Sequence, residues 1–288
     1  MSANQIGALF MMASMACFTL NDTFMKVTNG AIPLFQLLFL RGILTTLLII
    51  LLARWLNALH FNIARRDWGL IGLRSASEMA TAYFFITALF NMPLANVTAT
   101  LQALPLTVTL GGALLFREKV GWRRMSAILI GFIGMLLIVR PGAEGFNIYG
   151  IYALLAVLGV TIRDLVTRQL SADVPSMTVT LAASVTVMGF SGAASLTTPW
   201  VAISGMHALM VIGSSICIFG GYYFSVRVMR VGEISFIAPF RYTGLIWALV
   251  LGWLVFGDWP APLTLLGAGI VVTTGLFTLY RERATKDA

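Results

Sequence analysis

Charged side chains inside apolar segments are the residues of this chain that could do chemistry, and one arrangement of them occurs twice. Asp22 lies four residues before Lys26, and Asp164 lies four residues before Arg168, each pair in a long apolar run. This spacing places acid and base on one face of a helix. An unpaired charge near the bilayer centre costs at least about 2.5–3.5 kcal/mol. The acid and base either form a local ion pair, or the base extends to the membrane interface beside a helix end. Otherwise the acid faces a cavity and binds substrate, takes up a proton or locks the two halves together.

Arg74 and Glu78 repeat the four-residue spacing in another apolar segment. Tyr83 follows farther along that segment, so one helix would carry a base, an acid and an aromatic ring. Glu78 lies deeper than Arg74 and is the stronger candidate for a binding residue. A structural pair between Arg74 and Glu78 is the alternative.

Arg41 and Arg241 have no acidic partner at helical spacing on their own segments. The planar guanidinium group suits a bidentate carboxylate or phosphate. We predict cross-helix pairs of Arg41 with Asp22 and of Arg241 with Asp164, or else binding of an anionic group of a substrate. With neighbouring polar residues, the candidate set for substrate binding or gating is Asn21, Asp22, Arg41, Glu78, Tyr83, Gln102, Asp164, Arg241 and Tyr242.

The sequence does not predict catalysis. Cys17 and Cys217 fall in apolar segments without metal-ligand spacing, and His60 and His207 stand alone. A membrane-embedded enzyme would need a nucleophile or a metal cluster, for which His and Cys are too sparse. We predict no metal site, no cofactor and no ATP hydrolysis, since the sequence has no phosphate-binding loop of the form GxxxxGK[ST].

The composition is that of a membrane protein. Apolar residues make up 59% of the chain and charged residues 10%, and the mean hydropathy is +0.90, whereas a soluble domain carries about 25% charged residues. The formal net charge of +8 lies in loops rather than on an exposed stripe, which argues against nucleic-acid binding. Ten apolar segments are long enough to span a bilayer, at residues 6–26, 33–53, 68–90, 94–116, 123–140, 148–168, 176–197, 206–228, 234–256 and 262–280.

Basic loop residues gather on the side of the membrane that carries both termini. They are Arg54, Arg65, Arg66, Arg117, Lys119, Arg123, Arg124, Arg168, Arg227, Arg230, Arg281, Arg283 and Lys286. Cytoplasmic loops of membrane proteins are enriched in Lys and Arg. We therefore predict a multi-pass protein of the cell inner membrane with both termini in the cytoplasm. The first segment lacks the features of a signal peptide and is predicted to be a retained span.

The chain repeats itself at a distance of about 140 residues. The segment 20–26 returns at 162–168, and the segment 112–118 returns at 252–258. We therefore divide the chain into a first five-helix repeat, residues 1–143, and a second one, residues 144–288. Because five is an odd number of spans, the second repeat must be inverted, as in many secondary transporters. Pro105 and Pro239 fall inside the fourth and ninth spans, where each would break or kink its helix, either as a gate or as an inert kink.

Several of these segments together resemble a known family. The doubled acid-marked segment, residues 101–106 around Pro105, the glycine-containing stretch 131–142 and the Ala-Pro-Phe-Arg-Tyr run at 238–242 are similar to the drug/metabolite transporter (DMT) superfamily, EamA family, over nearly the whole chain. The resemblance implies an all-α membrane protein with ten transmembrane helices, arranged as two inverted five-helix repeats around a central cavity. Within the family, the chain is similar to bacterial S-adenosylmethionine, riboflavin and amino-acid carriers. The resemblance transfers no substrate-binding residue onto this chain.

These observations predict an inner-membrane secondary transporter that moves a small polar organic metabolite by alternating access. A cofactor-like substrate of the S-adenosylmethionine or riboflavin type is slightly favoured. Export of amino acids or related metabolites is the alternative, and a channel or a membrane-embedded enzyme is more remote. The partners are a small-molecule substrate and the lipid bilayer; a coupling proton or a counter-substrate, and the oligomeric state, are left open.

Overall fold

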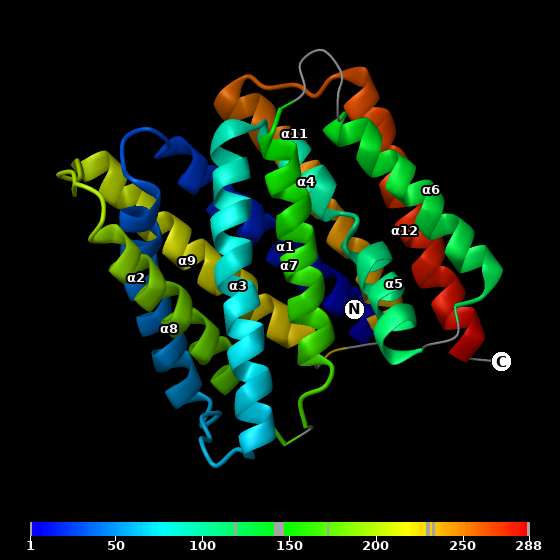
Figure 1. Ribbon diagram of the computed structural model, residues 1–288, viewed down its shortest axis with the longest axis horizontal. Helices are drawn as coiled ribbons and strands as arrows, with labels where there is room; N and C mark the ends of the chain where they lie inside the picture. Colours follow the sequence, from blue (N-terminus) through cyan, green and yellow to red (C-terminus); the bar gives the residue numbers. More distant parts are fainter. Residues whose placement is uncertain are drawn as a thin grey trace.

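The protein is a bundle of long helices that run roughly side by side (Figure 1). The computed structural model describes residues 2–117, 120–140, 147–171, 173–228, 231 and 234–286, and within these residues it contains helices and no strand. The helices are α1 (Ala3–Val27), α2 (Leu34–Trp55), α3 (Arg65–Asn91), α4 (Leu94–Leu101), α5 (Leu104–Phe116), α6 (Trp122–Val139), α7 (Tyr149–Thr167), α8 (Ser176–Ser195), α9 (Gly205–Val228), α10 (Ile234–Ile237), the 3₁₀ segment η1 (Ala238–Tyr242), α11 (Thr243–Phe256) and α12 (Pro262–Lys286).

The ten predicted spans correspond to helical segments of the structure. Nine segments of the described chain are long and apolar enough to cross a membrane. The tenth predicted span is α3, whose 27 residues are of sufficient length. Its charged residues, among them Asp67, Arg74 and Glu78, lower its hydropathy, and it packs against α7 and α8. A hydropathy criterion therefore misses α3 for the same reason that makes it a candidate for the site.

Both predicted proline positions interrupt their spans. The fourth span is divided into α4 and α5 at Gln102 and Ala103, and Pro105 is the second residue of α5. The ninth span begins as α10, continues as the 3₁₀ segment η1, which contains Pro239, and becomes α-helical again in α11. Proline lacks the N–H group that the regular helical bond requires, so a break at these two positions has a direct chemical cause.

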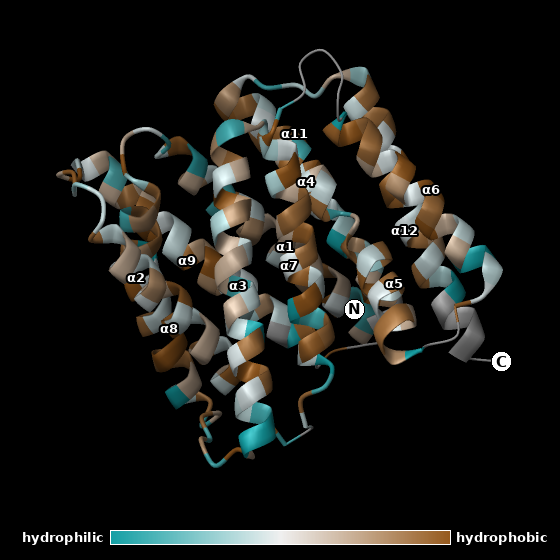
Figure 2. Cartoon of the chain, viewed as in Figure 1, coloured by the Kyte–Doolittle hydropathy of each residue, from teal (hydrophilic) through white to brown (hydrophobic). Residues whose placement is uncertain are grey.

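The outward surface of the helices is apolar. Leu114, Leu115 and Leu136 are 71%, 68% and 53% exposed. Figure 2 shows hydrophobic residues along the helices and hydrophilic ones mainly toward the helix ends and loops. Trp55 and Trp122, at helix ends, are also exposed, as expected for side chains at the boundary between lipid and water. The helices thus present the surface that a lipid environment favours.

The helix contacts come in matched pairs. α1 packs along α9, and α3 packs along α7; α3 also contacts α8, and α2 contacts α9. α2 packs on α8, α6 on α12 and α4 on α11. Exchanging each of the first five spans for its counterpart 140–142 residues later maps the α1–α9 contact onto α7–α3 and the α3–α8 contact onto α9–α2, and it maps each of the other three contacts onto itself. Two inverted repeats related by a two-fold axis would give this arrangement.

Glycines allow α6 and α12 to approach closely. A Cβ atom at Gly134 would lie 2.8 Å from the carbonyl oxygen of Gly267, and a Cβ atom at Gly267 would lie 2.6 Å from the carbonyl oxygen of Gly134. Only glycine fits at both positions without a shift of the backbone, since real Cβ atoms do not approach an oxygen so closely. The α6–α12 pair therefore forms a close crossing at the edge of the bundle (Figure 1).

Candidate functional site

A first polar cluster connects a residue of α2 to two residues of α1. Asn21 is buried, and its Nδ2 donates a hydrogen bond of 2.9 Å to Asp22 Oδ1. Arg41 Nη1 donates a bond of 3.2 Å to Asn21 Oδ1. Among the described residues Arg41 makes no ion pair within 4.0 Å, so the predicted direct pair of Arg41 with Asp22 is wrong. The Asn21 amide stands between them and links base to acid through two hydrogen bonds.

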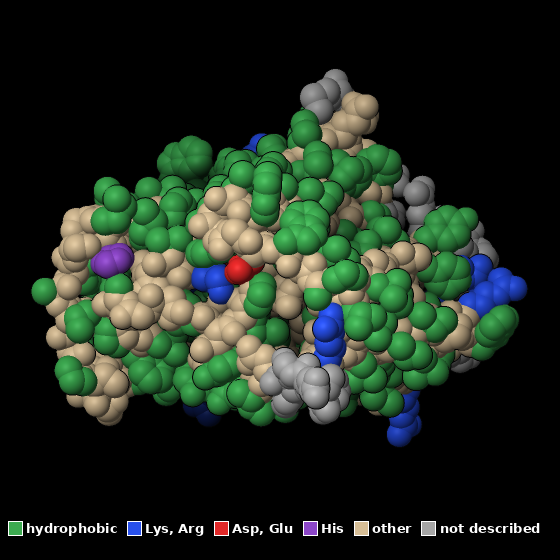
Figure 3. Space-filling view, turned by 90° about the horizontal axis from the view of Figure 1, so that it is seen from above, with side chains coloured by type: hydrophobic (Ala, Val, Ile, Leu, Met, Phe, Trp, Pro, Cys, Tyr) green, Lys and Arg blue, Asp and Glu red, His purple; other side chains and the backbone are tan. Residues whose placement is uncertain are grey.

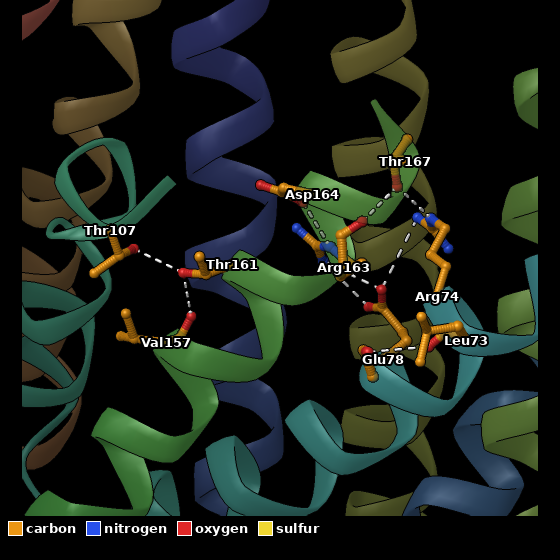
Figure 4. Close-up of polar contacts among 10 residues, drawn as sticks. Leu73, Arg74, Glu78, Thr107, Val157, Thr161, Arg163, Asp164 and Thr167 are labelled. Atoms are coloured by element: carbon orange, nitrogen blue, oxygen red, sulfur yellow. Dashed lines mark hydrogen bonds and ion pairs between the residues drawn. The ribbon is translucent and has the colours of Figure 1, made fainter. Parts of the chain in front are cut away.

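A second cluster joins α3 to α7 (Figure 4). Arg163 Nε donates a bond of 2.9 Å to Asp164 Oδ1, and its Nη1 lies 3.2 Å from Glu78 Oε2. Arg74 Nη2 lies 4.0 Å from the same Glu78 oxygen, and Arg74 Nε donates to Thr167 Oγ1 at 3.1 Å. All of these charged side chains are at most about one third exposed. Arg163 therefore shares two acids and holds the two helices together.

The two clusters occupy corresponding positions in the predicted repeats. Asn21 and Arg163 are 142 residues apart, and each precedes an acid to which its side chain donates a bond of 2.9 Å. The partners beyond them differ. Asn21 accepts a bond from Arg41, whereas Arg163 forms an ion pair with Glu78. Corresponding positions of the two predicted repeats thus hold a neutral amide that links two charged residues in the first and a salt bridge in the second.

Lys26 does not pair with Asp22, although the spacing of four predicts such a pair. Its Nζ donates to the carbonyl oxygens of Leu89, at 2.8 Å, and of Met92, at the end of α3. The last carbonyl groups of a helix have no partner within the helix, so a nearby ammonium group satisfies them. The same Nζ lies 5.4 Å from the centre of the Phe256 ring at the end of α11. Lys26 therefore fastens α1 to two other helix ends.

Arg168 repeats part of this arrangement at the opposite end of the bundle. Its guanidinium carbon lies 5.8 Å from the centre of the Phe116 ring, at the end of α5. Among the described residues, the Asp164 carboxylate bonds to the Arg163 side chain, so the spacing of four does not identify the side-chain partner of this acid either. Phe116 and Phe256 belong to the two repeated segments at 112–118 and 252–258. Glu118, the acid of the first of these, lies outside the described residues.

Arg241 lies in η1, within electrostatic range of Asp164. In the described part of the chain its side chain has no hydrogen bond and no ion pair within 4.0 Å, so the predicted Arg241–Asp164 salt bridge is wrong. The reason is local, because Arg163 is adjacent to Asp164 in the chain and occupies its Oδ1 atom.

A small cavity lies between α2 and α3 on one side and α8 and α9 on the other. Its volume is about 70 Å³. The charged residues in its wall are Arg41, Arg74 and Glu78, and Tyr222 of α9 also lines it. Both polar clusters therefore open onto one space, which is bounded by helices of the first and of the second predicted repeat.

The other candidate residues surround this region at different places. Tyr83 stacks on Phe35, with 6.1 Å between the ring centres, and contacts Tyr152 on α7. Gln102 is buried at the break between α4 and α5. The Tyr242 hydroxyl packs against Gly275 of α12. None of these three, nor Arg241, lines the small cavity that the described residues form.

Several residues of the clusters and of the cavity wall are absent from the set that the sequence predicts. Arg163 and Arg74 link the acids, and Thr45, Thr180 and Ser184 line the cavity. The adjacency of Arg163 to Asp164 could have identified the first of these. Hydroxyl residues are frequent in membrane helices, so the sequence carries no comparable signal for the last three. Among the described residues, no group of His, Cys, Asp and Glu side chains could hold a metal ion.

Comparison with known families agrees with this fold. Residues 5–140 match the EamA-like transporter family. The match covers slightly less than half of the chain and nearly all of residues 1–143. A solved crystal structure of 19% sequence identity superposes with a TM-score of 0.66, covering 96% of this chain and 96% of the other. At that identity the superposition shows a shared fold.

Curated relatives include transporters of different cargoes. An S-adenosylmethionine uptake transporter of Rickettsia conorii is 26% identical over 66% of this chain and 65% of its own length. A riboflavin transporter of Vibrio cholerae is 32% identical over 67% of this chain and 65% of its own length. A pseudopaline exporter of Pseudomonas aeruginosa is 24% identical over 96% of both chains. The matches to the first two relatives thus span about two thirds of the relatives' length, whereas the match to the exporter is nearly complete.

Proposed function

We propose that the protein is a secondary transporter that moves a small polar organic metabolite across the cell inner membrane by alternating access. The observation that carries the proposal is the cavity, because charged side chains inside a membrane bundle line a space between the two halves of the chain. Intramembrane charges of this kind mark substrate or ion pathways. The named relatives are transporters as well, which supports transport rather than an enzymatic activity.

Alternating access is supported by the size of the cavity and by the contacts around it. Sites for metabolites usually have volumes of about 300–1,000 Å³, and this cavity has about 70 Å³. The walls must therefore separate before a metabolite can bind. Lys26 with Phe256, and Arg168 with Phe116, join the two halves at opposite ends of the bundle. We propose that residues 1–143 and 144–288 move as two inverted repeats, and that these two contacts close the two sides.

The distribution of charge supports an orientation with both termini in the cytoplasm. Figure 3 shows the end of the bundle opposite the predicted basic loops. Near the centre of this face, a few charged side chains lie among hydrophobic and uncharged ones. The other side carries Arg54 in the last turn of α2, Arg65 and Arg66 at the start of α3, and Arg123 and Arg124 at the start of α6. Loops rich in Lys and Arg face the cytoplasm.

The proposed binding and gating residues fall into two groups. Arg41 and Glu78 line the cavity, and Asn21, Asp22 and Asp164 hold or neutralise the bases beside it. We propose that Tyr83, Gln102, Arg241 and Tyr242, with the breaks at Pro105 and Pro239, act in gating around the cavity. A coupling proton or a counter-substrate would act through the acids of the first group.

A cofactor-like substrate, of the S-adenosylmethionine or riboflavin type, is slightly favoured. Two of the relatives carry these molecules according to their names. The alternative is export of an amino acid or related metabolite, which the pseudopaline exporter supports because its alignment spans 96% of both chains. Both options place a polar organic molecule in the same cavity.

Transport in reconstituted vesicles tests the proposal. Uptake of labelled S-adenosylmethionine and riboflavin should saturate with concentration and be stimulated by unlabelled substrate inside the vesicles. Asp22→Asn should reduce the flux at least about tenfold while the yield and melting temperature stay near those of the wild type. Arg66→Gln, which changes an exposed base at the start of α3, should have no effect. Channel-like current without saturation, or a flux that Asp22→Asn leaves unchanged, would contradict the proposal.

A further inference from the structure

The charge in the cavity wall comes from one side only. Arg41 belongs to α2, and Arg74 and Glu78 belong to α3. The facing wall, from α8 and α9, contributes Ala183, Val187 and Ile218, with hydroxyl groups among them. A molecule in this cavity would therefore meet an ionic wall on one side and a mainly apolar wall on the other.

The two predicted repeats place corresponding positions on the two walls of the cavity, but the residues at these positions differ in charge. Thr46 Oγ1 lies 2.7 Å from Ser184 Oγ, and Gly42 packs against Met188. Adding 142 to Gly42 and Thr46 gives Ser184 and Met188, so the two contacts correspond to each other. By the same offset, Arg41 corresponds to Ala183. Both line the cavity. The repeat therefore places a guanidinium group on one wall where the opposite wall has a methyl group.

The same comparison holds for the acid. An offset of 140 residues relates Tyr83 and Phe84 to Tyr223 and Phe224. The two pairs of rings have nearly the same geometry, with centre distances of 5.4 and 5.5 Å and interplanar angles of 68° and 69°. The position that corresponds to Glu78 is then Ile218, and again both line the cavity. Two ionic residues of the first half thus face two apolar residues of the second.

Arg41 is the base in this wall that makes no ion pair among the described residues, whereas Arg74 is paired with Glu78 and has one buried Nη1 atom without a hydrogen-bond partner. Glu78 is shared by Arg163 and Arg74, so its oxygens are already engaged. Among the described residues, the Arg41 guanidinium group has one hydrogen bond, to the neutral amide of Asn21. A guanidinium group has five N–H donors in a planar fork that matches a carboxylate. Its remaining donors are available to a group in the cavity.

From this wall we propose a substrate class: an amphipathic carboxylic acid, whose carboxylate binds Arg41 and whose flat or apolar body rests on Ala183, Val187 and Ile218. The proposal rests on the proposed function, since it assigns the chemistry of the substrate in the same cavity. A neutral polar molecule would leave the donors of Arg41 without an acceptor in a low-dielectric surrounding. A carboxylate provides two acceptor oxygens and the compensating charge together.

Binding to the purified full-length protein in detergent tests this proposal. The probes are two matched pairs, S-adenosylmethionine with its decarboxylated form and flavin mononucleotide with riboflavin. We expect S-adenosylmethionine to bind at least about tenfold more tightly than the decarboxylated form. Arg41→Gln should abolish that difference, Arg41→Lys should keep part of it because the charge remains but the fork is lost, and Arg66→Gln should keep all of it.

The contrary outcomes are distinct. Equal binding of the first pair, a preference that survives Arg41→Gln, binding of neither member, or discrimination only between flavin mononucleotide and riboflavin would each overturn the carboxylate proposal. If Arg41→Gln fails to fold, the Arg41→Lys comparison decides, because an unchanged preference in that variant would overturn the role of the fork. Saturable riboflavin flux without any carboxylate preference would overturn this proposal and leave the transport function intact. Arg41-dependent carboxylate binding without flux would overturn the transport function and leave the carboxylate proposal intact.

Discussion

Lys26 of the first half of the chain lies over the ring of Phe256 in the second half, with 5.4 Å between its Nζ atom and the ring centre. Arg168 and Phe116 reverse this relationship, with the base in the second half and the ring in the first. Each contact therefore crosses between the halves. Together they join the halves at both ends of the bundle.

Removing the charge of Lys26 should loosen one of these ends. Lys26→Gln loses charged hydrogen bonds to the α3 carbonyl groups and the contact with the ring, and we expect the free energy of unfolding to fall by about 2 kcal/mol. A melting temperature lowered by several degrees in detergent would show it. Lys26→Arg keeps a cation at this place and should melt close to the wild type. A Lys26→Gln protein as stable as the wild type would rule out a fastening role.

Arg163 should be essential for stability because it holds two acids. Arg163→Gln leaves Glu78 and Asp164 without their closest cation. Removing one partner of a fully buried pair costs about 3–5 kcal/mol, and we expect a smaller loss here because these side chains are 17–34% exposed. The measurement is thermal unfolding followed by circular dichroism. Adding Glu78→Gln to Arg163→Gln should restore part of the loss, since one of the stranded charges is then removed. Simple additivity of the two losses would show that the pair is not coupled.

The crossing of α6 and α12 should tolerate no side chain at its centre. Gly267→Ala places a Cβ atom 2.6 Å from the carbonyl oxygen of Gly134, and such overpacking costs about 1–3 kcal/mol. Gly269→Ala, on the same helix, meets open space and serves as the matched control. We expect a lower melting temperature only for the first variant. Equal melting temperatures would mean that the helices can separate at no cost.

A left-handed residue directly follows the helix in both repeated segments. Arg117 has φ 55° after α5, and Gly257 has φ 69° after α11. Gly257→Ala should cost about 1 kcal/mol, because a Cβ atom is strained in this conformation. Gly257→Asn should cost less, since asparagine adopts left-handed conformations more readily. Unfolding in denaturant compares the two, and an alanine variant as stable as the wild type would contradict the strain.

Much of the architecture could be predicted from the sequence. Ten apolar segments correspond to helices, because the length needed to cross a bilayer is a strong physical constraint. Pro105 and Pro239 mark the two interrupted spans, since proline has no N–H group to donate. The pairing of helix contacts also has the form that the repeat at about 140 residues implies.

The partners of the charged residues were harder to predict. A spacing of four describes one helix, whereas the carbonyl groups that Lys26 contacts and the Asn21 amide that separates Arg41 from Asp22 depend on how helices pack. Likewise, Arg241 has no salt bridge among the described residues because Arg163 is closer to Asp164. Packing between segments distant in the chain decides these contacts, and a single sequence contains no direct record of it.

The one-sided lining of the cavity gives the cargo a direction. Arg41 stays on α2 whichever end of the bundle is open, so a molecule held by its carboxylate would always be turned the same way. It would then enter the site with one end leading and leave it with the other end leading. Import and export would be the same passage in opposite order, and the end of the molecule that meets the narrow part of the path first would differ between them. Bulky groups at one end of a substrate should therefore slow movement in one direction more than in the other.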